Sequence, residues 1–243
     1  MNFEELSSKF SGGLFFNSSS LHEAQKLIYS TDASVYQEKP VAVAVPKTNE
    51  DIKACIEFAN KNNITLIPRA AGTSLAGQVV GKGIVVDISK YFKNVIELNA
   101  AEKWVRVQPG IIRDDLNIYL RPYGLMYAPE TSTANRAMIG GMIGNNSCGL
   151  HSIVWGDARR HLLEAKVFLS DGTEVLLENL SSEELKQKAI QPGTEGKIYK
   201  EILSLLEDET NQKIIKEKYP KKAITRRNTG YALDILINEM QQT

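Results

Sequence analysis

The sequence has few of the features that mark secreted, membrane-spanning or nucleic-acid-binding proteins. It has only two cysteines among 243 residues, too few for the disulfide framework of a small secreted domain. Its longest apolar runs, such as 41–45, are far shorter than the roughly 20 residues that cross a bilayer. Its 29 basic and 29 acidic residues balance, whereas a general nucleic-acid binder has a basic excess. We therefore expect a cytoplasmic protein with no nucleic-acid partner; peripheral membrane association stays open.

Signal-peptide and metal-site patterns are also missing. The first residues are acidic and lack an apolar segment, so we expect no signal peptide. Cys148 and His151 have too few companions for a zinc site, which normally takes four ligands. Cys55 lies on the apolar stripe of a predicted helix and is interpreted as a core residue. We therefore predict no metal site.

The first third of the chain alternates between strand-like and helix-like patterns. Residues 41–45 predict a buried strand, and Thr48 with Asp51 forms a capping-box-like helix start. The helix pattern itself is apolar at i, i+3, i+4 and i+7, at Ile52, Cys55, Ile56 and Ala59. Residues 64–67 predict a second strand. A strand, a helix and a strand in this order predict a βαβ unit whose two strands are parallel neighbours.

The remaining pattern predicts an α+β fold with a charged, helical C-terminal part. Further strands are expected at 84–88, 95–98, 104–107, 164–169 and 174–177, the last two joined by an Asp-Gly turn. Helices are expected at 21–29, 112–120, 182–190, 197–207 and 211–218. Residues 122–156 form a long segment rich in Gly, Asn, Ser and Thr with little obvious regular structure. Such long segments inside a compact domain are usually functional.

The loop 68–77, with the sequence PRAAGTSLAG, follows the second predicted strand directly. Gly72 and Gly77 allow backbone N–H groups to approach a ligand closely, and Thr73 and Ser74 add hydroxyl donors. Arg69 adds a fixed positive charge. Such a run is typical of a phosphate-binding nest, although a tight strand-to-strand turn is the alternative. The glycine spacing fits neither the Rossmann fingerprint nor the nucleoside-triphosphate loop.

A second glycine-rich segment, 139–151, has the sequence IGGMIGNNSCGLH. Its glycines and small polar side chains make poor core but a good wall for a polar or phosphorylated ligand. The run 129–133 before it adds hydroxyl donors. A long flexible surface loop is the alternative, but Ile139, Met142 and Ile143 would anchor the segment to a core. The imidazole of His151 could lie near such a ligand or face solvent.

Together these segments resemble the flavoproteins with the vanillyl-alcohol-oxidase (PCMH) type of FAD-binding domain. Residues 68–74 match the family's pyrophosphate loop, except that Ala70 stands where glycine is common, and alanine requires a negative φ. Residues 140–146 and 155–161 resemble two further family segments, and the lead Asp32-Ala33-Ser34-x-Tyr36 also matches. The resemblance covers residues 30–177.

The resemblance implies a PCMH-type fold, with a small βαβ-containing subdomain, a larger mixed sheet and flanking helices. We expect a helical lead (1–30), a first FAD subdomain with the pyrophosphate loop (31–100), a second FAD subdomain (101–178), and a helical insertion with the truncated end of the domain (179–243). Thr73 stands where some relatives attach FAD through histidine, which implies non-covalent FAD. The implied FAD-binding residues are Arg69, Ala70, Ala71, Gly72, Thr73, Ser74, Gly77, Gln78, Pro129, Thr131, Gly140, Gly141, Gly144, Asn145, Ser147, Gly149 and His151.

Residues 226–234 resemble the D-lactate, glycolate and D-2-hydroxyglutarate dehydrogenase group. This implies FAD-linked oxidation of a small-molecule 2-hydroxy acid. Arg227 and Asn228 are weak candidates for substrate binding, and a solvated basic pair is the alternative; no catalytic residue is assigned. We expect the chain to be the N-terminal piece of a longer enzyme, with the substrate cap and an iron–sulfur domain outside it and the electron acceptor open. The alternatives are a non-catalytic FAD-binding fragment or subunit, and the FAD subunit of another PCMH-type oxidoreductase.

Overall fold

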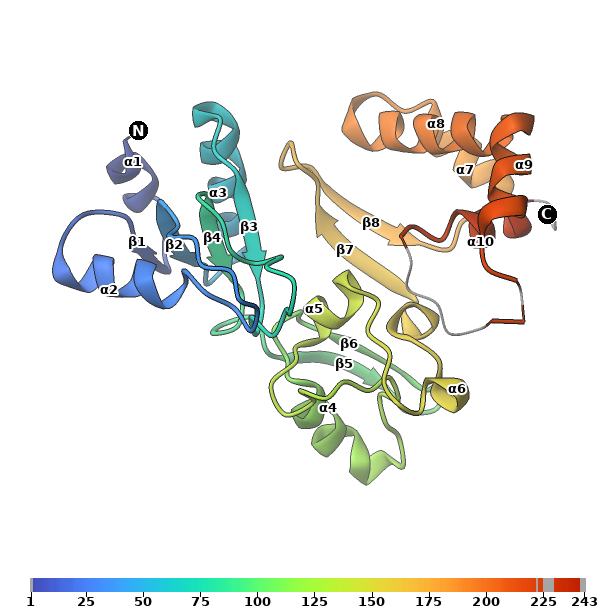
Figure 1. Cartoon of the computed structure of the whole chain (residues 1–243), viewed down its shortest axis with the longest axis horizontal. Helices are drawn as coiled ribbons and strands as arrows, with labels where there is room; N and C mark the ends of the chain where they lie inside the picture. The colour runs from blue at the N-terminus through green and yellow to red at the C-terminus, as the bar shows by residue number, and fades with distance from the viewer. Residues whose placement is uncertain (1, 222, 225–229, 241–243) are drawn as a thin grey trace. The chain divides into compact units, whose positions relative to one another are not determined.

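The computed structural model describes residues 2–221, 223–224 and 230–240 (Figure 1). It divides into two compact units, Met1–His161 and Leu162–Thr243. The boundary lies inside the 101–178 part expected from the sequence, and the four-part division stays a prediction. The mixture of sheets and helices confirms the predicted α+β fold class.

A four-stranded sheet forms the centre of the first part of the chain (Figure 1). Its order is β1 (Gly13–Phe15), β2 (Ala42–Val45), β4 (Ile84–Asp87), β3 (Leu66–Arg69). The strand β1 is antiparallel to β2, and β2, β4 and β3 are parallel. Every residue of β2 and β4 is buried, as expected for strands covered on both faces.

The prediction that the first two strands are neighbours is wrong, because β4 lies between β2 and β3. The apolar pattern specifies which residues are buried but not the lateral order of strands. In retrospect, β3 has the features of an edge strand. It contains Pro68, which cannot donate a ladder hydrogen bond, and only Ile67 of its four residues is buried.

Helices cover both faces of this sheet. The helix α3 (Asn49–Asn62) packs Cys55 and Phe58 against one face, and α1 (Phe3–Ser7) adds Leu6 to the same cluster. The other face is packed by Phe15 and by Tyr29, which follows α2 (Ser20–Ile28). The capping box at Thr48 and Asp51 is confirmed, with both reciprocal hydrogen bonds present.

The remainder of the first unit surrounds a second core of Ile111, Leu116, Leu120, Ala137, Ile139 and Met142. Its elements are β5 (Val95–Asn99), β6 (Trp104–Val107), α4 (Arg113–Leu120), η1 (Arg121–Tyr123), α5 (Ile139–Gly144), α6 (Ser152–Trp155) and η2 (Ala158–His161). The helix α5 lies in a segment expected to be irregular. Three glycines in six residues lower its helix propensity, but burial of Ile139 and Met142 overrides that tendency.

The second unit contains β7 (Glu164–Phe168), β8 (Glu174–Glu178), α7 (Ser182–Ala189), α8 (Gly193–Glu207), α9 (Glu209–Lys218) and α10 (Leu233–Met240). The helices α8, α9 and α10 share a small core of Leu206, Ile215 and Ile237. Where the resemblance implies one larger mixed sheet, the described strands form two antiparallel pairs, β5–β6 and β7–β8. Short local turns specify such pairs, whereas side-chain alternation alone does not specify pairing between strands far apart in sequence.

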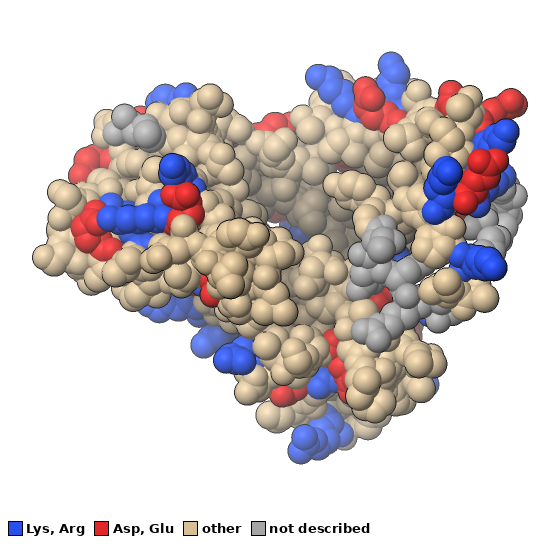
Figure 2. Space-filling view, viewed as in Figure 1, with Lys and Arg blue, Asp and Glu red and all other residues tan. Residues whose placement is uncertain are grey.

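Charges of both signs are mixed over the visible face of the molecule (Figure 2). Lys and Arg side chains lie beside Asp and Glu, as in the pairs that Glu23 forms with Lys26 and Lys39. This face therefore presents no broad surface of one sign. Within the described part of the chain, no helix has the length and apolar character needed to span a bilayer.

Candidate functional site

The first glycine-rich segment is the connection between β3 and β4. Gly72 and Gly77 have φ values of 66° and 73°, a left-handed conformation that glycine adopts without steric cost. Ala70 keeps a negative φ, as an alanine at that position requires. In the described structure, the backbone N–H groups of Ala71, Gly72 and Thr73 have no hydrogen-bond acceptor. The segment thus presents consecutive donors that the protein itself does not use.

Residues 29–36 support this loop through side-chain and backbone contacts. The Nη1 atom of Arg69 donates to the carbonyl oxygen of Thr31 at 2.8 Å. The Arg69 guanidinium also lies over the Tyr29 ring, 5.2 Å from its centroid. A Cβ added to Gly77 would come within 2.7 Å of the Tyr36 ring. The loop is therefore shaped by residues that the sequence analysis did not include in the site.

Ser74 and Asp32 contribute the polar contacts of the loop. The Ser74 hydroxyl accepts weak hydrogen bonds from the N–H groups of Ala76 (3.4 Å) and Gln78 (3.3 Å). Burial alone would raise the pKa of the Asp32 carboxyl, but hydrogen bonds from Ser34 and the charge of Arg69 outweigh burial and lower that pKa. One Asp32 oxygen, Oδ2, is buried and has no hydrogen-bond partner among the described residues.

The second glycine-rich segment begins with α5 and is packed closely against the core. A Cβ added to Gly140 would lie 2.6 Å from the Cβ of Pro109, and one added to Gly149 would lie 2.2 Å from the Cβ of Glu130. The Ser147 hydroxyl donates to the side-chain oxygen of Asn145 at 2.6 Å. These glycines permit close packing, and neither of them has a positive φ.

His151 and Glu130 form an exposed pair at the end of this segment. His151 Nδ1 lies 2.9 Å and 2.8 Å from the two Glu130 carboxylate oxygens. The His151 backbone N–H also donates to Glu130, at 3.2 Å. These contacts lower the pKa of the Glu130 carboxyl. The imidazole is thus oriented by a carboxylate while most of its surface remains exposed.

The two segments meet at Ala70 and Gly141, which are 71 positions apart in the sequence. A Cβ added to Gly141 would lie 3.5 Å from the Cβ of Ala70. The backbone N–H of Gly141 has no acceptor among the described residues. The structure therefore brings unused N–H donors of both segments to one surface, which we name the glycine cradle: residues 70–74 and 140–141.

The other predicted FAD-binding residues lie in or next to the same two glycine-rich segments or in the run 129–133 before the second one. Pro129 is buried, and its carbonyl accepts from Arg113 Nε at 3.2 Å. The hydroxyls of Thr131 and Thr133 lie 3.4 Å apart. Gly144 ends α5 with open space where a Cβ would be. Arg227 and Asn228 lie outside the described residues. No cluster of His, Cys, Asp or Glu suited to a metal ion occurs in the residues that the structure describes.

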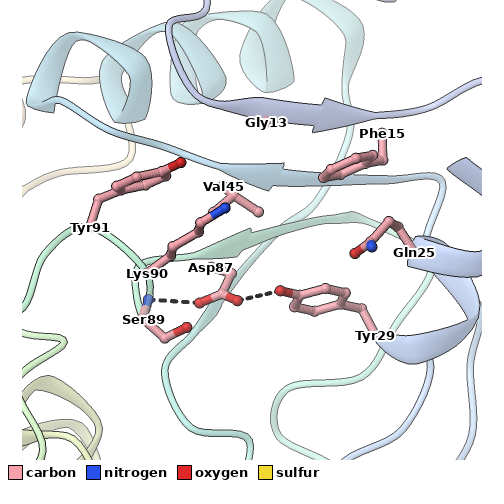
Figure 3. Close-up of a pocket in the computed structure, with 9 residues that line it drawn as sticks. All are labelled: Gly13, Phe15, Gln25, Tyr29, Val45, Asp87, Ser89, Lys90 and Tyr91. Carbon is pink, nitrogen blue, oxygen red and sulfur yellow. Dashed lines mark hydrogen bonds between the residues drawn. The ribbon is translucent and has the colours of Figure 1, made fainter. Parts of the chain in front are cut away.

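A cavity of about 420 Å³ is lined in part by Tyr29, the residue whose ring lies under the Arg69 guanidinium (Figure 3). It is lined by Gly13, Phe15, Gln25, Tyr29, Val45, Asp87, Ser89, Lys90 and Tyr91. The Tyr29 hydroxyl donates to the Asp87 carboxylate, which also accepts from the Ser89 N–H at 2.7 Å. No cradle residue lines the cavity, so the cradle is not part of it.

The cradle has the chemistry of a phosphate- or dinucleotide-binding surface. It combines unused backbone N–H donors, which suit phosphate oxygens, with glycines whose missing side chains leave room for a ligand. No carboxylate belongs to it. These observations fit a binding surface for a phosphorylated ligand, such as the pyrophosphate of FAD.

A family model described as "FAD binding domain" matches residues 40–178, more than half of the chain. The chain therefore belongs to this FAD-binding domain family.

The chain is similar in sequence to several proteins, including a dehydrogenase and an oxidase subunit. D-2-hydroxyglutarate dehydrogenase of Pantoea ananatis is 34% identical over 223 residues, which cover 90% of this chain and 21% of the relative. Glycolate oxidase subunit GlcD of Escherichia coli K12 is 30% identical over 182 residues, 72% of this chain and 36% of the relative. The chain thus spans about a fifth of the first relative and about a third of the second.

The fold is also found in solved structures of low sequence identity. BBE-like 1 of Physcomitrella patens superposes with a TM-score of 0.65 and 19% identity, over 76% of this chain and 39% of that protein. This likeness confirms the PCMH-type fold implied by the sequence resemblance.

Sequence reasoning missed the residues that contact the two glycine-rich segments. Tyr29, Thr31, Asp32 and Tyr36 contact the first segment or Arg69 at its start, and Glu130 contacts the second. A signal was present for part of this set. The lead Asp32-Ala33-Ser34-x-Tyr36 contributed to the family resemblance, but nothing in it showed that Tyr36 contacts Gly77. Glu130 lies in the run 129–133, where the sequence pattern indicated only hydroxyl donors.

Proposed function

We propose that this chain is the FAD-binding part of a flavin-dependent dehydrogenase that oxidises a 2-hydroxy acid of the D-2-hydroxyglutarate, D-lactate or glycolate class. The observation that carries the proposal is the meeting of the two glycine-rich segments at Ala70 and Gly141. The substrate class is supported by the relatives, one a D-2-hydroxyglutarate dehydrogenase and the other a subunit of glycolate oxidase.

In this proposal the backbone of the cradle holds the pyrophosphate. The N–H groups of Ala71, Gly72, Thr73 and Gly141 are the free donors. The cofactor is held non-covalently, because Thr73 offers a hydroxyl where an attaching side chain would stand. Bound FAD supplies the acceptor for the electrons of the substrate, while the chain supplies binding, orientation and electrostatics. His151, oriented by Glu130, is placed at the rim of the second segment.

The substrate and electron-transfer partners belong to parts beyond the cradle. Arg227 and Asn228 remain weak candidates for binding the substrate carboxylate. The glycolate oxidase relative is a subunit by its name, which supports further subunits or domains, including a substrate cap and an iron–sulfur part. We place the protein in the cytoplasm or peripherally at a membrane.

The test is FAD retention by the purified 243-residue chain, measured by flavin absorbance after desalting. A matched pair of variants locates the site. Gly141→Leu places a side chain toward Ala70, whereas Gly144→Leu, in the same helix, meets open space. We expect wild type and Gly144→Leu to retain FAD and Gly141→Leu to lose it.

The results separate the proposal from its alternatives. Absence of FAD from wild type, or equal retention by both variants, contradicts the assigned site. Anaerobic addition of D-2-hydroxyglutarate, D-lactate or glycolate to the FAD-loaded longer enzyme, with its substrate cap, tests the reaction through loss of flavin absorbance. Retention of FAD with no bleaching by any of the three favours a non-catalytic FAD-binding fragment or subunit.

A further inference from the structure

Arg69 lies at the start of the loop, and its guanidinium is already engaged by the protein. Its Nη1 donates to the Thr31 carbonyl at 2.8 Å, and its Cζ lies 5.2 Å from the centroid of the Tyr29 ring. An arginine placed to bind phosphate would direct its donors toward the ligand in a bidentate fork. Here one of those donors is used to connect β3 to the segment before β2.

Gly72 rests directly on the same guanidinium. A Cβ added to Gly72 would lie 2.5 Å from Nη2, 2.9 Å from Cζ and 3.1 Å from Nε of Arg69. These three atoms belong to one planar group, so a side chain at Gly72 would collide with the guanidinium, and only glycine lets the loop pass this close to it. The positive φ of Gly72, 66°, is the conformation that turns the loop over Arg69.

Tyr29, the aromatic partner of Arg69, is itself held in place. Its hydroxyl donates to the carboxylate of Asp87, at the end of the buried strand β4 (Figure 3). Asp87 is only 6% exposed and also accepts from the Ser89 N–H. Burial and the Asp87 carboxylate raise the pKa of Tyr29, so the hydroxyl remains a donor. A continuous path of contacts therefore joins β4 to Gly72 through Asp87, Tyr29 and Arg69.

The geometry points to Arg69 as a positioning residue: its guanidinium, held by Tyr29 and Thr31, supports Gly72 so that loop 70–74 keeps its binding shape, and it does not bind the pyrophosphate itself. This inference rests on the proposed function for its ligand. The planar guanidinium is essential to it, because an ammonium can neither stack on an aromatic ring nor donate in a fixed fork.

The test compares Arg69→Lys, which keeps the charge, with Arg69→Met, which removes it. We expect both to weaken FAD binding by about tenfold, or 1.4 kcal/mol, and the salt dependence of the dissociation constant to remain that of wild type. Arg106→Lys is the matched control, because Arg106 also lies over an aromatic ring, Trp104, at 5.8 Å. Arg106→Lys should bind FAD as wild type does. Tyr29→Phe, which keeps the ring and loses the bond to Asp87, should give a smaller loss.

A second measurement needs no cofactor. Leu75 is 80% exposed, so thermolysin cleavage before Leu75, identified by mass spectrometry, reports the mobility of the loop in the FAD-free chain. Cleavage should be faster in Arg69→Lys and Arg69→Met than in wild type and Arg106→Lys, while circular dichroism confirms that each variant is folded. If a variant does not fold, Tyr29→Phe alone carries the comparison.

The outcomes distinguish this inference from the proposed function. Near-normal FAD affinity in Arg69→Lys with loss in Arg69→Met, together with unchanged cleavage, would show a direct charge contact and overturn the inference. Failure of wild type to bind FAD would contradict the proposed function, and the cleavage rates would still decide whether Arg69 supports the loop.

Discussion

The two glycine-rich segments have similar compositions but use glycine for different physical reasons. In the first, Gly72 and Gly77 provide positive φ values, and side chains from residues 29–36 support the loop. In the second, Gly140 and Gly149 have no positive φ and instead allow the backbone to approach Pro109 and Glu130. One segment depends on backbone conformation and the other on closeness of packing.

This difference shows why glycine content alone does not reveal how a segment works. The first segment is mounted on an edge strand, and most of its own residues are only half-buried. The second is anchored to a core by Ile139 and Met142. We therefore expect substitutions in the second segment to affect folding stability most, and substitutions in the first to affect ligand binding most.

The largest expected effect comes from Gly149→Ala. The added methyl group would lie 2.2 Å from the Cβ of Glu130 and 3.0 Å from its backbone, so the backbone must shift. We expect the free energy of unfolding to fall by about 3 kcal/mol, the upper part of the range for overpacking. Gly144→Ala, in open space, should be neutral or slightly stabilising. Equal stability of the two variants in urea unfolding would contradict the close-packing explanation.

Gly72→Ala should have a smaller effect on stability and a larger one on binding. Alanine at a positive φ costs about 1–2 kcal/mol, and its methyl group would push on Arg69. Gly124→Ala is the control, since Gly124 has a similar φ of 68° and no neighbour within 4 Å. Both variants should lose similar stability by thermal unfolding, but only Gly72→Ala should lose FAD in a titration. Loss of FAD by both Gly72→Ala and Gly124→Ala would show that the effect is not specific to the first glycine-rich segment, which contradicts the prediction.

Asp32→Asn tests, through the pH dependence of folding stability, how residues 29–36 support the first glycine-rich segment. The pKa of Asp32 is lowered from its usual 3.8 in the folded chain, so folding favours the charged carboxylate. Its contribution is fully present above about pH 4 and is lost as pH falls through the folded-state pKa. We expect the charged carboxylate to contribute less than about 1 kcal/mol to the free energy of unfolding, because the site is partly exposed. Wild type should lose stability below pH 4 more steeply than the variant, and parallel curves would contradict this.

Glu130→Gln should have the smallest effect. The pKa of Glu130 is also lowered from its usual 4.5, by its bonds to His151, so its contribution too is present above pH 4.5 and lost at lower pH. The pair is exposed and screened by solvent. We expect a melting temperature close to that of wild type at pH 7. A drop comparable to that of Gly149→Ala would show that the hydrogen bonds between Glu130 and His151, and not close packing, stabilise the second segment.

Much of the fold was predictable because local patterns determine it. The capping box at Thr48 and Asp51, the buried run 42–45 and the Asp-Gly turn of the β7–β8 hairpin all carry their structural reason in adjacent residues. The order of β2, β4 and β3 was not predictable in this way, because all three have apolar character and the order depends on how they pack together. The helix α5 was missed because tertiary contacts of Ile139 and Met142 stabilise it against its glycines.

The candidate site shows the same division. The loop 68–77 and the segment 139–151 were recognisable because glycine, hydroxyl and amide residues cluster in sequence. The contact between Ala70 and Gly141 joins residues far apart in the chain and required the structure. The roles of Tyr29 and Thr31 also required the structure. An aromatic residue after a helix is most often a core residue, and Thr31 contacts Arg69 through its backbone carbonyl.

The burial of Cys55 has a practical consequence for spectroscopy. Its side chain is fully buried, and burial raises the pKa of the thiol to about 12; because the thiolate is the reactive form, a maleimide will leave it unmodified in the folded chain. Cys148, half-buried between Ser147 and Gly149, is then the position where a fluorophore attaches. The native sequence therefore already provides a single labelling position in the second glycine-rich segment, without engineering the protein.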